Sequence, residues 1–207
     1  MSESYKEALL EAIDQLAIAL DDTQIEQLLA YHSGLIKWNK AYNLTAVRDP
    51  MAMVQRHLID SLSILPVLPS GRLLDVGTGG GLPGMVVAIT RPDIAVTLLD
   101  SNGKKIRFLR QMTMELGLKS VATIQSRVES YSAEPFDVIT SRAFATLADM
   151  VSWSQHLLAP DGQFIAMKGL YPDDELAALP SDIQVTSVRQ LQVPGADGQR
   201  HLVVLSR

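Results

Sequence analysis

The stretch LLDVGTGGGLPG, residues 73 to 84, limits the possible folds of this chain more than any other segment. A short apolar run that contains Asp75 leads directly into a loop in which five of eight residues are glycine. Glycine allows sharp turns and allows a ligand to approach the backbone without meeting a Cβ atom. Pro83 suits the first turn of a following helix. The segment therefore predicts a strand, a ligand-binding turn and a helix, and a turn that uses glycine for packing alone is the alternative.

From Arg72 onward, short apolar runs alternate with helical patterns. The expected strands are 72–76, 95–100, 120–126, 136–140 and 162–168, and the expected helices are 83–90, 103–116, 145–158 and 172–179. This alternation is typical of βαβ units and of a largely parallel sheet with helices on both faces. The last two runs, 182–193 and 199–206, are joined by PGADG, a turn short enough to join only antiparallel strands. We predict an α/β fold with a mostly parallel seven-stranded sheet and an antiparallel C-terminal hairpin.

The first third of the chain is predicted to be helical. Apolar residues recur at helical spacing from Leu9 to Ala17 and again from Ile25 to Leu35. A third helix is expected over 51–65, after Pro50. We expect residues 1–66 to form a helical extension packed on a core of residues 67–207, together making one globular unit.

Composition excludes several classes of protein. The 207 residues include no cysteine, so disulfides, thiolate metal sites and cysteine nucleophiles are ruled out, and a reducing compartment is expected. The N-terminal residues lack the apolar core of a signal peptide, and no apolar run approaches membrane-spanning length. We expect a cytoplasmic protein with no membrane partner. The net charge of −5 means that a nucleic-acid partner would need a local basic patch.

Asp100 is the second sign of a nucleotide-like ligand. It ends the second predicted strand, 25 positions after Asp75. A carboxylate in this place can accept hydrogen bonds from both hydroxyls of a ribose. It can also cap the helix that DSNGKK opens, and the two roles are compatible.

Three classes of nucleotide site compete for the glycine loop. A P-loop is excluded because Met85 stands where a lysine is required. The dinucleotide pattern fits Gly79-x-Gly81-x-x-Gly84, which would indicate an NAD-dependent oxidoreductase. That register begins three residues beyond Val76, however, whereas dinucleotide sites usually begin at the strand end.

The other register is Gly77-x-Gly79-x-Gly81 preceded by Asp75. It matches the D-x-G-x-G-x-G pattern of class I S-adenosylmethionine (SAM) methyltransferases, and the C-terminal hairpin also resembles that fold. The ammonium group of the methionine moiety favours a nearby acid, and Asp75 is placed to meet it directly or through water. A non-catalytic SAM-dependent binding module is a further alternative.

Eight motifs together resemble the RsmG (GidB) family. In order they are KWNKAYNLTAVRDP, RHLIDSL, LLDVGTGGGLPG, LLDSNGKKIRFLRQ, QSRVE, FDVITSRAFA, MKG and RHLVV, which extend from Lys37 to Val204. The resemblance implies a Rossmann-like class I methyltransferase fold preceded by N-terminal helices. It also implies a SAM-dependent enzyme that methylates N7 of a guanine in bacterial 16S ribosomal RNA. Whether the substrate is free RNA, the small ribosomal subunit or its precursor stays open.

The resemblance further implies which residues bind the cofactor. They are Gly77, Gly79 and Leu82 in the loop, Asp100 at the ribose, Val128 and Glu129 beside the adenine, and Arg142 near the methyl donor. From the residues alone, a solvated helix position is the alternative for Glu129. No metal site is expected.

Basic residues that follow strands or flank the hairpin are the candidates for RNA contact. We expect Arg127, Lys168 and Arg200 to bind RNA, and Arg142 and Lys168 to orient the target base. No general base is expected, because N7 of guanine carries a lone pair and has no proton to lose.

Other polar and basic residues have plainer interpretations. Outside the strand ends, basic residues gather in two parts of the sequence: Lys37, Lys40 and Arg48, followed by Arg56 and His57, and then Lys104, Lys105, Arg107 and Arg110. The second cluster is typical of an ordinary solvated helix face, and Trp38 of a core residue. His57 and Asp60, at helical i, i+3 spacing, are expected to be a surface pair or a cap, because further metal ligands are lacking.

Overall fold

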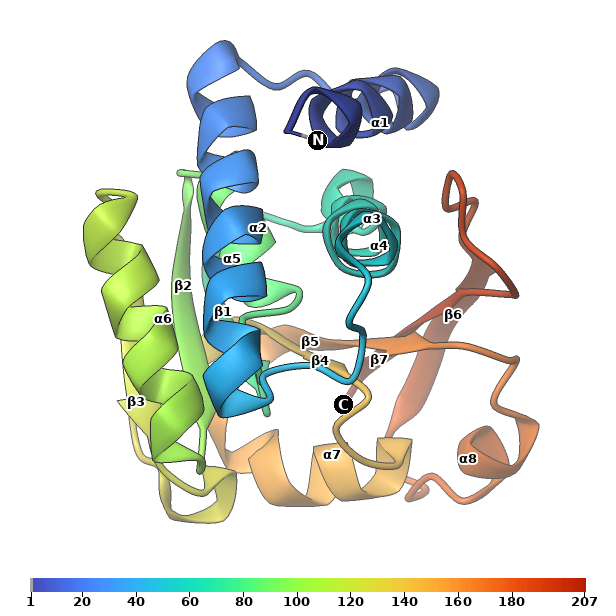
Figure 1. The fold of residues 1–207 in the computed structure, drawn as a ribbon. Coiled ribbons are helices and arrows are strands. Elements are labelled where there is room, and N and C mark those ends of the chain that lie inside the picture. The colour runs from blue at the N-terminus through green and yellow to red at the C-terminus, as the bar shows by residue number, and fades with distance from the viewer. Residues whose placement is uncertain (1) are drawn as a thin grey trace.

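The computed structural model describes residues 2–207, so Met1 of the predicted extension lies outside the described residues. Seven strands form one twisted sheet with helices on both faces (Figure 1). The strands are β1 (Gly71–Val76), β2 (Ile94–Asp100), β3 (Val121–Gln125), β4 (Phe136–Arg142), β5 (Leu158–Lys168), β6 (Gln184–Gln190) and β7 (His201–Ser206). Their order is β3-β2-β1-β4-β5-β7-β6. Strands β1 to β5 are parallel, and β7 runs antiparallel to both β5 and β6, which confirms the predicted sheet.

The longer helices fall where the sequence predicts them. They are α1 (Ser2–Gln15), α2 (Asp22–Tyr42), α5 (Gly84–Thr90), α6 (Gly103–Glu115) and α7 (Leu147–Ser154), with a short α8 (Asp173–Ala177) before the hairpin. Asp21 begins α2 with a capping box, in which its side chain accepts from the Gln24 N–H and the Gln24 side chain accepts from the Asp21 N–H. The hairpin turn contains Gly195 and Gly198, both with positive φ.

The sheet separates two apolar layers. Adjacent residues of a strand point to opposite faces, so Leu73 packs with α5, α6 and the N-terminal helices, whereas Leu74 packs with α7. Both leucines are fully buried. The helices before β1 thus share one hydrophobic core with the sheet, and α2 lies against α5 and α6 (Figure 1).

The third N-terminal helix differs from the uniform α-helix expected over 51–65. It consists of α3 (Pro50–Met53), the π-helix η1 (Val54–Ile59) and α4 (Asp60–Leu62), and the 3₁₀ turn η2 (Leu65–Val67) follows. Asp49 caps its start by accepting from the Ala52 N–H at 2.7 Å. A π-turn inserts one extra residue and shifts the helix face by about one position. The spacing of apolar residues does not reveal such a shift, because this helix is buried on several sides and its apolar residues do not mark a single face.

The direction in which successive strands are added to the sheet reverses at β1. The chain moves outward from β1 to β2 and β3, then returns to the other side of β1 to form β4 and β5. Loops after β1 and β4 therefore diverge at this point, and ligands of open α/β sheets bind in such a crevice.

The glycine loop after β1 requires its glycines. Gly77, Gly79 and Gly81 have φ values of +64°, +60° and +100°, a region that other residues rarely adopt. Gly84 has ordinary helical φ but stands against β1 and β2: a Cβ atom there would lie 2.6 Å from Asp75 Oδ2 and would overlap the Leu98 side chain. The tight approach of α5 to the sheet thus depends on a missing side chain.

We expect Gly84→Ala to lower the free energy of unfolding by about 1–3 kcal/mol, because the methyl group overpacks a filled site. Gly169→Ala is the matched control, since a Cβ atom there would meet nothing within 4 Å. The control should change stability by less than about 0.5 kcal/mol. Urea denaturation measures both, and equal effects of the two substitutions would contradict the packing argument.

Candidate functional site

A cavity of about 450 Å³ opens at the carboxyl ends of β1, β2 and β4. Four of the predicted cofactor residues line it: Gly77, Asp100, Val128 and Glu129. The remaining lining residues are Val76, Leu99, Ser101, Lys105, Ser126, Arg127, Ala143, Phe144 and Trp153. Arg127, expected at the RNA, thus lies beside the predicted cofactor residues. Below, this space is called the first cavity.

Asp100 is held firmly at the mouth of the first cavity. Its Oδ2 accepts from the Gly79 N–H at 2.9 Å, and its Oδ1 accepts from the Asn102 N–H at 2.8 Å. The ammonium of Lys105 lies 3.8 Å from Oδ2. Asn102, not Asp100, caps α6, because its side chain accepts from the Lys104 N–H. Each carboxylate oxygen can accept more than one hydrogen bond, so Asp100 keeps capacity for ligand hydroxyls.

Asp75 lies beneath the glycine loop and is fully buried. Its Oδ2 accepts from the Thr78 hydroxyl at 2.7 Å and from the Gly84 N–H at 2.8 Å. Its Oδ1 is buried and has no hydrogen-bond partner among the described residues. Burial raises the pKa of this carboxyl to about 7, although the two hydrogen bonds oppose the rise. Asp75 therefore fixes the loop from within the core and does not itself line the first cavity.

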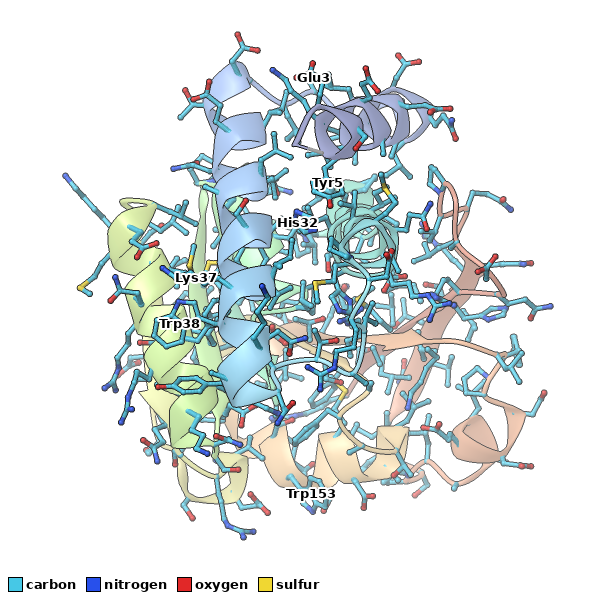
Figure 2. The ribbon with its side chains drawn as sticks, viewed as in Figure 1. Glu3, Tyr5, His32, Lys37, Trp38 and Trp153 are labelled. Carbon is cyan, nitrogen blue, oxygen red and sulfur yellow. The ribbon has the colours of Figure 1, made fainter. Side chains whose placement is uncertain are left out.

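Two aromatic rings that were not predicted form a wall of the first cavity. Phe144 and Trp153 meet edge to face with ring centroids 5.8 Å apart. A Cβ atom at Gly77 would overlap the Phe144 ring, so this glycine also makes room for the wall. Figure 2 shows Trp153 on α7. Phe144 lies within the SRAFA motif and could have been suspected, whereas nothing in the sequence marks Trp153.

A second cavity of about 370 Å³ adjoins the first and shares Ala143 with it. It is lined by Arg56, His57, Asp60, Arg142, Ala143, Met167, Lys168, Gly169 and Arg200. The fold therefore brings together Arg142, Lys168 and Arg200, three of the basic residues singled out in the sequence. Arg142 lines this second cavity and not the first, and Leu82 is buried and lines neither. Gly79 reaches the first cavity only through its bond to Asp100.

Asp60 joins two of these arginines. Its Oδ2 lies 3.2 Å from Arg142 Nη1, and its Oδ1 lies 2.9 Å from Arg200 Nε. Asp60 is only 3% exposed, so the expectation of a surface pair or cap was wrong. The reason is tertiary: a buried carboxylate is tolerated here because two guanidinium groups compensate its charge. Arg142 and Arg200 each need a nearby anion, and this need was the one signal in the sequence that could have pointed to Asp60.

His57 orients Arg142 from the other side. Arg142 Nη2 lies 3.3 Å from His57 Nδ1, and a guanidinium can only donate, so Nδ1 accepts. The ring proton then sits on Nε2, which donates to the Thr45 hydroxyl at 2.8 Å. Burial, helped by the charge of Arg142, lowers the pKa of His57 to about 4. His57 is therefore a neutral, buried positioning group at neutral pH.

Lys168 is anchored at the end of β5. Its ammonium donates to the Ala145 carbonyl at 2.9 Å and to Glu175 at 2.7 Å. Glu175 also accepts from the Leu147 N–H, which starts α7. This carboxylate was not predicted, since α8 carries acids throughout its first turn and nothing distinguishes one of them.

Within residues 2–207 the structure has no helix long and apolar enough to cross a membrane. No group of three or more His, Asp or Glu side chains in the same residues has an arrangement that could hold a metal ion.

The sequence comparisons agree with one another. A family model described as rRNA small subunit methyltransferase G (GidB) matches residues 24–203. The protein named ribosomal RNA small subunit methyltransferase G of Yersinia pestis (strain Pestoides F) is 55% identical over 203 residues, which cover 95% of this chain and 98% of that protein. The protein of the same name from Yersinia pseudotuberculosis serotype O:1b (strain IP 31758) is equally similar.

Solved structures with the same fold are more distant in sequence. TrmN from Thermus thermophilus superposes with a TM-score of 0.58 at 20% identity, over 82% of this chain and 53% of that one. A SAM-dependent methyltransferase from Aquifex aeolicus gives a TM-score of 0.59 at 18% identity, over 82% and 96% of the two chains. At this identity the likeness shows the fold, which is that of class I methyltransferases.

His57 should make stability depend on pH between about 4 and 6.5. The folded protein keeps the ring neutral down to about pH 4, whereas the unfolded chain takes up the proton near 6.5. The unfolded state binds more protons in this range, so the His57 contribution to stability falls by about 3 kcal/mol as the pH drops from 6.5 to 4. Urea denaturation should show the difference between wild type and His57→Gln changing in this direction.

The contribution of Asp75 to stability should change with pH in the opposite direction. Its pKa is about 7 in the fold and 3.8 in the unfolded chain, so its contribution is present at low pH and is lost as the pH rises through 7. The difference between wild type and Asp75→Asn should therefore shrink as that of His57→Gln grows. Parallel stability curves for wild type and both variants from pH 4.5 to 7.5 would show that neither group is perturbed.

Proposed function

Since the chain belongs to the rRNA small subunit methyltransferase G family, we propose that it transfers a methyl group from SAM to N7 of a guanine in 16S ribosomal RNA. By family and fold the chain is a SAM-dependent rRNA methyltransferase. The choice of 16S RNA and of guanine N7 is the proposal, and it follows the family resemblance of the motifs.

The observation that carries the proposal is the pair of adjoining cavities that meet at Ala143. One combines apolar walls with the carboxylate of Asp100, and the other combines four cationic side chains, those of Arg56, Arg142, Lys168 and Arg200. A methyl transfer from a nucleoside cofactor to a base in RNA needs two such sites, one for the cofactor and one for the base of a polyanion. Holding donor and acceptor in adjacent pockets converts a bimolecular encounter into an oriented one.

The donors of the first cavity fit SAM. Asp100 would accept the ribose hydroxyls, Val128 would pack on the adenine, and Glu129 would lie beside it. Gly77 and Gly79 let the backbone approach, and Leu82 supports the loop from within the core. Asp75, buried beneath the loop, would act on the methionine end indirectly, by fixing the loop backbone through Thr78 and Gly84. SAM supplies the methyl group; the chain supplies position.

The second cavity would hold the target guanine. Arg142 and Lys168 carry more N–H groups than their protein contacts use, so each can still donate to O6, the acceptor beside N7. His57 and Asp60 hold the guanidinium of Arg142 in place. N7 attacks with its own lone pair, so no residue needs to remove a proton. Arg142 directly precedes Ala143, where the cavities join, so we place it between the two substrates.

RNA around the target nucleotide would meet Arg127 and Arg200 as well as Lys168. The second cavity takes Asp60 from the N-terminal helices and Arg200 from the hairpin, so we propose that 1–66 and 67–207 work as one unit. A cytoplasmic location follows from the proposed substrate. The form of that substrate, free RNA or the assembled small subunit, is decided by the experiment below.

The proposed reaction is tested with labelled SAM and undermethylated 16S RNA, small subunits or their precursors, followed by mass mapping of the product. Label at guanine N7 supports the proposal. Label at another atom would show that guanine N7 is not the methyl acceptor. RNA binding without methyl transfer would indicate a SAM-dependent assembly factor.

Asp100→Ala should weaken SAM binding by about 1–3 kcal/mol, because hydrogen bonds to a charged acceptor are lost. Calorimetric titration of the folded variant measures this effect. Asp182→Ala is the control, since Asp182 is exposed and lies outside the first cavity. Unchanged affinity in Asp100→Ala would remove this residue from the ribose role.

The rate of methyl transfer should vary little between about pH 6 and 9 in single turnovers with saturating SAM and RNA. An obligatory base would produce a titrating limb, and His57, with its lowered pKa and occupied Nδ1, is not suited to provide one. A tenfold or steeper rise across this range would indicate an acceptor that must first lose a proton.

A further inference from the structure

Two helices that are far apart in the sequence form one surface beside the first cavity. The C-terminal half of α2 packs against α6, with the rings of Trp38 and Phe108 5.7 Å apart (Figure 1). Arg107 on α6 donates to the Tyr42 hydroxyl on α2 at 3.3 Å. Figure 2 shows Lys37 and Trp38 on the side of α2 that lies beside α6. Lys37 and Lys40 on α2 and Lys104, Arg107 and Arg110 on α6 are therefore exposed on neighbouring helices.

The surface formed by these two helices is basic, although the protein as a whole is acidic. Neither 33–48 nor 101–114 contains an aspartate or glutamate, although the whole chain has a net charge of −5. The α2–α6 surface is defined here by its exposed cations, which are Lys37, Lys40, Lys104, Arg107 and Arg110. Such a separation of charge concentrates positive potential where the overall charge would repel a polyanion.

Three of these cations are not neutralised by the protein. Among residues 2–207, no hydrogen bond or ion pair involves the side chains of Lys37, Lys40 or Lys104. Other basic residues nearby are engaged: Arg48 donates to the Asn39 carbonyl and the Asn43 side chain at the end of α2, and Lys105 faces Asp100. The free ammonium groups are thus available to an external anion.

The position of the surface links it to the proposed reaction. Helix α6 begins three residues after Asp100, and Lys105 lines the first cavity. Helix α2 lies over the glycine loop, where the Tyr31 hydroxyl donates to the Gly80 carbonyl at 2.6 Å. From Lys104 to Arg110 the helix rises about 9 Å, comparable with two to three nucleotides of a strand at about 3.4 Å each.

We propose that the α2–α6 surface binds backbone phosphates of the RNA outside the target nucleotide. The inference rests on the proposed function, because it takes the polyanion to be the same RNA whose base enters the second cavity. Exposed cations on two neighbouring helices suit a flexible phosphate chain that is recognised by its charge. The surface adds affinity and orientation, while the cavities select the base.

The test compares two triple variants that each remove three positive charges. The surface variant is Lys37→Gln, Lys40→Gln and Lys104→Gln, and the control is Lys6→Gln, Lys119→Gln and Arg189→Gln, which lie on other exposed positions. Both are titrated with undermethylated 16S RNA and with small subunits over a range of salt concentrations. We expect the surface variant to bind at least about tenfold more weakly, with a salt slope lower by about 2, and the control to bind like wild type. SAM affinity should be unchanged in both.

The outcomes separate this surface from the proposed reaction. Equal binding by the two variants on both substrates overturns the surface. Wild-type protein that binds RNA through this surface but transfers no methyl group overturns the reaction and keeps the surface. If the wild-type protein methylates the RNA and the surface variant binds RNA normally, the proposed reaction stands and the proposed surface is overturned.

Discussion

The buried carboxylate of Asp75 holds the site together. Its Oδ2 ties Thr78 in the loop and Gly84 at the start of α5 to the end of β1. Thr78 in turn donates its N–H to the Leu99 carbonyl, and Gly79 donates to Asp100, so the loop is fastened to β2 as well. One acid therefore sets the relative positions of two strands, a helix and the carboxylate at the mouth of the first cavity. Burial without a full set of partners makes this arrangement sensitive to protonation.

The sheet could be predicted because its signals are local. Apolar runs, glycine turns and the PGADG hairpin each specify their own segment, and parallel strands place their carboxyl ends at one edge. That is why Gly77, Asp100, Val128 and Glu129 meet in the first cavity as expected. The π-helix from Val54 to Ile59 could not be predicted, since it depends on packing between elements and leaves no clear period in the sequence.

The second cavity shows where local analysis fails. Asp60 lies 82 residues from Arg142 and 140 from Arg200, so no spacing rule connects them. In sequence, His57 and Asp60 resemble any polar pair on a helix surface; burial and their arginine partners give them a role. Phe144 and Trp153 likewise became part of a wall through tertiary packing. Arg142 was identified correctly as a strand-end residue, but the structure places it on the far side of Ala143 from the predicted cofactor residues.

The shared carboxylate of Asp60 also links the two ends of the chain during synthesis on the ribosome. Every residue that lines the first cavity has been made once translation passes Trp153. The second cavity is incomplete until Arg200 has emerged and β7 has paired with β5, because only then does Asp60 gain its second guanidinium. A growing chain thus contains every residue of the first cavity well before every residue of the second. The C-terminal hairpin therefore supplies the last residue that the second cavity requires.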